Sequence, residues 1–203
     1  MTALQKHSNA LQIADYMLAH FEGVLLDELD ALLERSKSAW RVGTRAGKPG
    51  IVRRVPEGVQ VGGDLVMARS GRAGVRLARA WEELYGQNPN PSEAYRLAIL
   101  AVEDAAVPIV ASNDASATLG KVLNQVDNGG WRLPMNREHE KATSHDVLVG
   151  MIRLLWHGQH DRHGGQPSGP GNVSMEEATV AVGLATTLVQ FFDAGLVRRE
   201  TSA

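Results

Sequence analysis

The apolar positions of the chain recur mostly at intervals of three and four residues, the spacing of one face of an α-helix. From residue 9 to about residue 37 this spacing, with acidic residues between the apolar ones, predicts a single amphipathic helix. The spacing breaks between Trp40 and Gly63. There we predict a β-hairpin, with strands Ile51 to Val55 and Val59 to Val61 on either side of the turn Pro56-Glu-Gly58.

The rest of the chain predicts five more helices. They run from Arg72 to Tyr85, from Pro91 to Pro108, from Ser116 to Val126, from Thr143 or Ser144 through Leu155, and from Ser174 to Phe192. Their starts carry a proline at the first helical position, a threonine or serine N-cap, and a capping box from Ser174 to Glu177. No strands alternate with these helices. The pattern therefore predicts an all-α helical bundle with an N-terminal helix and a small β-hairpin insert.

We expect two parts in this bundle, residues 1–63 with the N-terminal helix and basic hairpin and residues 64–203 with the helical bundle, in one continuous globular unit. Val75, Val147 and Leu154 are predicted to face inward, and the tail beyond Val197 is predicted to be frayed. The chain has neither a phosphate-binding loop nor a dinucleotide fingerprint. A nucleotide-driven α/β enzyme is therefore disfavoured.

The composition is that of a soluble globular protein, with 203 residues of which 43% are hydrophobic and 22% charged. No run approaches the roughly 18 apolar residues that span a bilayer, so we expect a cytoplasmic protein without a membrane partner. The chain has no cysteine, which excludes disulfides, thiolate catalysis and cysteine-bound zinc. Histidine and carboxylate remain as the metal ligands to consider.

Basic residues are concentrated between Arg35 and Arg79. This stretch holds 11 of the 21 lysines and arginines but only two acidic residues, Glu57 and Asp64. A local basic excess favours a polyanionic partner, because arginine and lysine supply most sequence-independent affinity for nucleic acids. The predicted RNA contacts are Arg53 and Arg54 on the hairpin and Arg72, Arg76 and Arg79 on one helix face. The alternative is a solvated basic face without a ligand.

The segment from Arg153 to Gly164 concentrates more chemistry than any other, with three of the seven histidines, two arginines and an aspartate. A helical continuation places His157 and His160 within roughly 40° of Arg153 on one face. His163 lies about 80° off that axis. Arg162 points to the opposite side of an ideal helix, but the glycines nearby, at positions 158, 164 and 165, weaken the helix and allow its end to unwind.

Metal-independent RNA cleavage is the first chemistry that this segment suggests. A histidine with a pKa near its reference value of about 6.5 takes the proton from a ribose 2′-hydroxyl at neutral pH. An arginine offers a planar set of donors to the phosphate oxygens as charge develops in the transition state. Arg153, His160, Arg162 and His163 supply both residue types and are the candidate catalytic residues.

Two alternatives use the same residues. His157, His160 and His163 with Asp161 form a candidate metal site, although three ligands at this spacing spread over about 120° of a regular helix. The segment also suits a structural role, because cationic side chains at a helix C-terminus interact favourably with its exposed carbonyl groups. Of these readings we adopt the first, which needs neither a metal nor a cofactor.

An alanine-rich helix is predicted after Pro91, the turn Ala115-Ser-Ala-Thr-Leu-Gly120 comes next, and a leucine-rich helix then leads to His163-Gly164. A glycine-rich linker and a last apolar helix follow. This order of features, from Pro91 to Phe192, resembles the abortive-infection C-terminal domains of the HEPN superfamily.

The resemblance implies a HEPN-like bundle of four to five helices and an endoribonuclease of a phage-defence or toxin type. It implies a homodimer with two sites across a shared cleft, and an antitoxin or defence-system partner. Arg153 and His160 match the family's motif of arginine and histidine separated by four to six residues. If His163-Gly164 is instead the family's His-Gly, Trp156 stands at the arginine position. The alternative function is therefore a non-catalytic HEPN-like module that binds RNA or protein.

Overall fold

The computed structural model describes residues 10–21, 26–45, 48–158 and 173–200. In chain order its elements are α1 (Ala10–His20), α2 (Leu26–Arg35), β1 (Trp40–Arg45), β2 (Lys48–Arg53), α3 (Glu57–Arg69), α4 (Gly71–Tyr85), α5 (Pro91–Val110), α6 (Leu119–Asn128), β3 (Trp131–Arg132), α7 (Ser144–His157), α8 (Met175–Asp193) and β4 (Arg198–Arg199). The predicted all-α class is confirmed, because helices dominate the described chain and its strands form only two small antiparallel pairs. None of the described helices is both long enough and apolar enough to cross a membrane.

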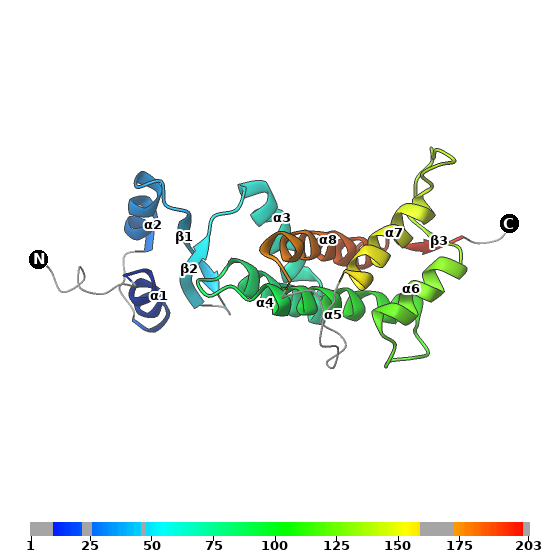
Figure 1. Ribbon diagram of the computed structural model, residues 1–203, viewed down its shortest axis with the longest axis horizontal. Helices are drawn as coiled ribbons and strands as arrows, with labels where there is room; N and C mark the ends of the chain where they lie inside the picture. Colours follow the sequence, from blue (N-terminus) through cyan, green and yellow to red (C-terminus); the bar gives the residue numbers. More distant parts are fainter. Residues whose placement is uncertain (1–9, 22–25, 46–47, 159–172, 201–203) are drawn as a thin grey trace, which may run out of the picture.

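The N-terminal elements form a small core of their own at one end of the molecule (Figure 1). Leu18 of α1, Leu33 of α2 and Ile51 of β2 are buried together. Carboxylates of the two helices also hold the hairpin, since Asp15 accepts a hydrogen bond from the Ile51 amide at 2.7 Å and Asp30 accepts one from the Val42 amide at 2.8 Å. The hairpin is thus fastened to both helices by buried side chains and by hydrogen bonds from its backbone amides to aspartate side chains.

The single long N-terminal helix predicted from the spacing is wrong. The helix α1 ends at His20 and α2 begins at Leu26. Gly23 lies between them in the sequence, and glycine disfavours a helix interior by about 1 kcal/mol relative to alanine. The apolar spacing continues across this break because both helices cover the same hairpin core.

A β-hairpin is present, but the strand predicted at Ile51 to Val55 pairs with a different partner. The strand β2 pairs with β1 upstream of it, with Val42 opposite Ile51, while residues 57–69 form the helix α3 instead of a strand. Pro56 occupies the N-cap of α3, and Glu57 adds a negative charge to its first turn, where the helix dipole favours it. Two valines at alternate positions are too short a pattern to separate a strand from a helix. The basic residues Arg53 and Arg54 nevertheless lie at the hairpin, as predicted.

The main core is built around α5, which packs against α4, α6 and α8. Nine of its residues are buried, and Asn90 caps its start by accepting a hydrogen bond from the Glu93 amide at 3.1 Å. The predicted start at Pro91 is therefore confirmed. The predicted end at Pro108 is wrong by two residues, because a proline so close to the C-terminus removes only one helical hydrogen bond and α5 continues to Val110.

The last two long helices begin at the predicted caps. Thr143 caps α7, and Ser174 and Glu177 form the capping box of α8. The tail differs from the prediction, since β4 pairs with β3 and the Glu200 amide donates to the Gly130 carbonyl at 2.9 Å. Three residues predicted to face inward are instead exposed: Val75 at 59%, Val147 at 44% and Leu154 at 59%.

Candidate functional site at the end of α7

The helix α7 has a buried face and an exposed face that carries charge. Leu148, Ile152 and Leu155 are fully or almost fully buried in the main core. The opposite side presents Arg153 and His157, one helical turn apart and both exposed. The predicted common face of these two side chains is therefore found, at the end of the helix that leads into the remaining residues of the candidate site.

His160, Arg162 and His163, like Asp161, lie outside the residues that the structure describes. Their predicted roles as base and phosphate ligand remain predictions. Of the four candidate catalytic residues, Arg153 alone is placed, and His157 belonged to the predicted metal site instead.

The guanidinium of Arg153 pairs with a carboxylate of the neighbouring helix. Its Nη2 lies 2.9 Å from Oδ2 of Asp127 on α6, and the two side chains are 50% and 43% exposed. An ion pair this exposed contributes at most about 1 kcal/mol. Asp127 therefore orients the Arg153 guanidinium without binding it so strongly that an incoming phosphate is excluded.

A side chain of α5 contacts the last turn of α7. The hydroxyl of Tyr95 lies 3.1 Å from the carbonyl oxygen of Leu155 and 3.4 Å from that of Leu154. The amide of Gly158, the C-cap residue, donates to the Leu154 carbonyl at 3.0 Å. The Leu155 carbonyl, which the helix end leaves without a helical partner, is thus bonded.

An apolar groove with a volume of about 320 Å³ lies beside this turn, between α7 and α8. Its walls are mostly aliphatic, with Glu176 and Glu177 at the start of α8. Leu154 and Val180 line it and are each more than half exposed. Trp156, two residues after Leu154, packs instead on α6, where a Cβ on Gly120 would lie 2.5 Å from its ring. The Trp156 ring is therefore part of the packing between α6 and α7.

The three arginines predicted to bind RNA from α4 are in different electrostatic states. Arg72 and Arg76 both pair with Asp104 of α5, whose side chain is only 11% exposed, and the distance from Arg72 is 2.9 Å. The two cations are thereby partly neutralised by one carboxylate. Arg79, on the same helix, is exposed and has no ion pair among the described residues. The positive charge that this helix face offers to a polyanion is therefore smaller than the sequence spacing alone suggests.

The two hairpin arginines also differ. Arg54 is half-buried, with its Nε donating to the Ser38 carbonyl at 3.2 Å and its Nη2 lying 3.7 Å from Asp30. Arg53 is exposed and lies close enough to Tyr85 to oppose the increase in pKa that burial causes in that phenol. Of this pair, Arg53 is the more accessible to a polyanion.

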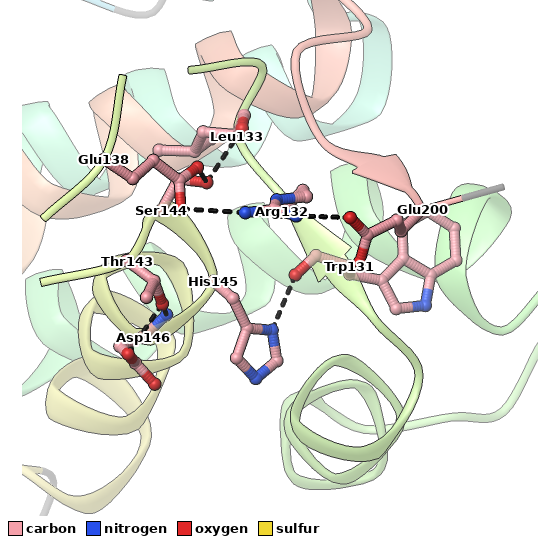
Figure 2. A network of polar contacts seen from close by, with 9 residues as sticks. All are labelled: Trp131, Arg132, Leu133, Glu138, Thr143, Ser144, His145, Asp146 and Glu200. Atoms are coloured by element: carbon pink, nitrogen blue, oxygen red, sulfur yellow. Dashed lines mark hydrogen bonds and ion pairs between the residues drawn. The ribbon is translucent and has the colours of Figure 1, made fainter. Parts of the chain in front are cut away.

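Figure 2 shows a second polar cluster, at the N-terminal end of α7. Arg132 of β3 donates to Glu138 at 2.8 Å and to Glu200 at 2.5 Å. The hydroxyl of Ser144, a residue only 4% exposed, contacts both the carboxylate of Glu138 and, at 2.9 Å, the carbonyl of Leu133. This network ties the segment before α7 to the end of the described chain.

Each charged group in this network has an opposite charge or a hydrogen-bond donor beside it. The hydroxyl of Ser144, and then Arg132, hold the pKa of the Glu138 carboxyl below its usual value, although desolvation opposes them. Nδ1 of His145 lies 2.8 Å from the carbonyl of Trp131. A carbonyl only accepts, so Nδ1 carries the proton in this contact. The cluster has the character of a structural clamp.

No group of three histidine, aspartate or glutamate side chains within the described ranges is arranged to hold a metal ion. Three of the four residues of the predicted metal site fall outside those ranges. That alternative is therefore untested by the geometry.

No protein-family model, curated protein or solved structure matches the chain. The proposed function therefore rests on the geometry at the end of α7 and on the spacing of Arg153 and His160 in the sequence.

Sequence reasoning missed the partners of the site. Asp127 directly follows the helix predicted from Ser116 to Val126 and is not among the predicted site residues, and Tyr95 was predicted only to face inward. The pairs Arg153–Asp127 and Tyr95–Leu155 are separated by 26 and 60 residues. No local spacing signals such contacts, so nothing in the single sequence identifies them.

Proposed function

We propose that the protein is a metal-independent endoribonuclease of a phage-defence or toxin type, with its site at the C-terminal end of α7. The observation that carries the proposal is the exposed pair Arg153 and His157, one turn apart on the outer face of that helix. This pair leads directly into the chain's densest run of histidine and arginine. The bundle of α5 to α8 is, in this proposal, a HEPN-like fold.

The proposed reaction uses the RNA's own 2′-hydroxyl as nucleophile. A histidine, His163 or His160, takes the proton of that hydroxyl, and its oxygen attacks the adjacent phosphorus. The bond from phosphorus to the 5′-oxygen breaks, the departing oxygen takes a proton, and the products end in a 2′,3′-cyclic phosphate and a 5′-hydroxyl. Arg153 or Arg162 stabilises the phosphate oxygens as charge develops on them.

The ion pair with Asp127 supports Arg153 in this role. An arginine held at 2.9 Å by a half-exposed carboxylate is oriented before RNA arrives. The guanidinium has five donors, and one carboxylate contact leaves others for phosphate oxygens. Arg53, Arg54, Arg72, Arg76 and Arg79 are proposed as secondary RNA contacts, of which the exposed Arg53 and Arg79 contribute most.

The protein is further proposed to act as a homodimer, with an antitoxin or defence-system protein as a second partner. The exposed apolar side chains of Leu154 and Val180, which line the groove beside the site, support a second copy of the chain at this face. Static light scattering at tens of micromolar tests this directly. A mass of one chain at that concentration removes the shared cleft from the proposal.

RNA cleavage in the presence of EDTA tests the proposed reaction. We expect total RNA to be cut into fragments with 2′,3′-cyclic phosphate ends, and His163→Ala or His160→Ala to slow cleavage by about 10²- to 10⁴-fold. His139→Ala, which removes an exposed histidine of the segment before α7, is the matched control and leaves the rate unchanged. Intact RNA at high protein concentration, or equal cleavage by all variants, contradicts the proposal. Loss of cleavage on adding the chelator favours the metal site instead.

A non-catalytic binding module is the second candidate function. The apolar groove beside Arg153, with Leu154 exposed at 59%, favours it, since an exposed leucine suits a binding surface. RNA that binds in a fluorescence-anisotropy titration but stays intact identifies this function.

A further inference from the structure

The hydroxyl of Tyr95 and the missing side chain of Gly158 meet at the last turn of α7. Tyr95 is 5% exposed and belongs to α5, the central helix of the main core. Its hydroxyl has one proton, which it donates to the Leu155 carbonyl at 3.1 Å; the Leu154 carbonyl is further away, at 3.4 Å. A rigid core helix therefore holds the turn that ends in His157.

Gly158 is required here by space and not by backbone conformation. Its φ of −72° and ψ of −13° are right-handed helical values, which any residue adopts. A Cβ at this position, however, would lie 2.1 Å from the Tyr95 hydroxyl oxygen and 2.9 Å from the Leu154 carbonyl oxygen. A side chain at 158 therefore displaces either the hydroxyl of Tyr95 or the end of α7.

Tyr95 contacts the end of this turn, beyond its other contacts with the core. Leu155 is buried in the core and Trp156 packs on α6, but Arg153, Leu154 and His157 are exposed. The Leu154 carbonyl also accepts the Gly158 amide, so the Tyr95 hydroxyl lies at the point where the chain leaves the helix. A change of this contact alters the direction of the backbone at His157.

We infer that Tyr95 and Gly158 are positioning residues, which fix the last turn of α7 and with it the imidazole of His157 and the guanidinium of Arg153. Neither residue is proposed to touch RNA. The effect on cleavage rests on the proposed nuclease function, whereas the effect on the His157 imidazole does not. The two claims are therefore separable by experiment.

The test uses the full chain with Tyr95→Phe, which removes only the hydroxyl, and Gly158→Ala, which adds only the Cβ. The matched controls are Tyr85→Phe, at a half-buried tyrosine of α4, and Gly62→Ala, where a Cβ meets no atom within 4 Å. The readouts are the His157 imidazole signals in ¹H–¹³C NMR spectra, assigned with His157→Ala, and kcat and KM for RNA cleavage.

We expect both test variants to shift the His157 signals and to lower kcat by about tenfold with KM changed less than about twofold, because small displacements of catalytic groups reduce rates more than binding. The controls leave the signals and kcat at wild-type values. His157 signals that match the controls in both test variants overturn the inference, whatever the activity. Shifted signals in a protein that leaves RNA intact uphold the positioning role and refute the nuclease.

Discussion

The two ends of α7 contrast in how their charged groups are used. At the N-terminal end, Arg132 bridges two glutamates and Ser144 is buried against one of them. At the C-terminal end, Arg153 and His157 are exposed, and Arg153 has a half-exposed carboxylate as its partner. Charges that a protein neutralises internally hold its structure, and charges that stay exposed beside an apolar groove are available to a ligand. The comparison makes the first end a structural clamp and supports the second end as the proposed site.

Removing Arg153 is expected to give the largest effect. Arg153→Ala takes away the proposed phosphate ligand and slows RNA cleavage by about 10²-fold, the effect typical of one transition-state hydrogen-bond donor. Its free energy of unfolding changes by less than about 1 kcal/mol, because the pair with Asp127 is exposed. Initial rates and urea unfolding on the same samples measure both quantities.

Arg137→Ala serves as the control for that variant, since it removes an exposed arginine from the segment before α7. Equal rates for Arg153→Ala and Arg137→Ala contradict the assignment of Arg153 to the site.

Removing Ser144 is expected to do the opposite. Ser144→Ala leaves the partly buried Glu138 carboxylate and the Leu133 carbonyl without the buried hydroxyl they share, which lowers the free energy of unfolding by about 1 to 3 kcal/mol. The cleavage rate per folded molecule stays at the wild-type value. Urea unfolding measures the loss, with the exposed Ser112→Ala as control. A stability equal to that of the control means that the network is no clamp.

Acid is expected to weaken the clamp before the core. The pKa of Glu138 is below its usual value in the folded protein, chiefly through its hydrogen bond with Ser144. A depressed folded-state pKa stabilises the protein above the unfolded-state value of about 4.3, and this contribution is lost as pH falls through the folded value. Asp114, in the segment that joins α5 to α6, is a second carboxyl with a lowered pKa. Its pKa is about 2, chiefly because of its hydrogen bond with Lys121.

Thermal unfolding between pH 6 and pH 2 measures this dependence. We expect Tm to fall below about pH 4, and to fall less in Glu138→Gln, which has no proton to gain. Parallel curves for the variant and the wild type exclude Glu138 as a source of the acid sensitivity.

The smallest expected effect concerns the partner of Arg153. Asp127→Asn removes the carboxylate that competes with phosphate for the guanidinium, so RNA binding strengthens by a few-fold, in line with about 1 kcal/mol or less for an exposed pair. The dissociation constant for RNA is measured for His163→Ala and for the double variant His163→Ala, Asp127→Asn. Because His163→Ala impairs cleavage, the comparison reports binding alone. Weaker binding instead shows that orientation of Arg153 by Asp127 outweighs the competition.

The parts of the fold that local signals specify were predicted correctly. Asn90 with Pro91, Thr143, and Ser174 with Glu177 each start a helix where the sequence indicates, because a cap depends on residues three positions apart. The exposed common face of Arg153 and His157 follows from the helical period in the same way.

The errors arose where distant residues decide the structure. The strand β2 pairs with Trp40–Arg45, a choice that depends on the helices α1 and α2 packing over the hairpin, and not on the Pro-Glu-Gly turn. Leu154 continues the apolar spacing of α7, but no described element covers its side chain. The helical period alone does not show which apolar side chains another element buries. The contacts of Arg153 with Asp127 and of Tyr95 with Leu155 join separate helices.

Cleavage of RNA that lacks its nucleophile tests the central claim most directly. Wild-type protein in EDTA is incubated with one oligonucleotide in two forms, unmodified and fully 2′-O-methylated, and the fragments are resolved by mass. The proposed reaction predicts that the unmodified form is cut to 2′,3′-cyclic phosphate ends and that the methylated form stays intact, because a methyl group replaces the proton that the base removes and leaves the 2′-oxygen as an ether that cannot act as the nucleophile. Equal cleavage of both forms, or of neither, contradicts the assignment of 2′-hydroxyl chemistry to the end of α7.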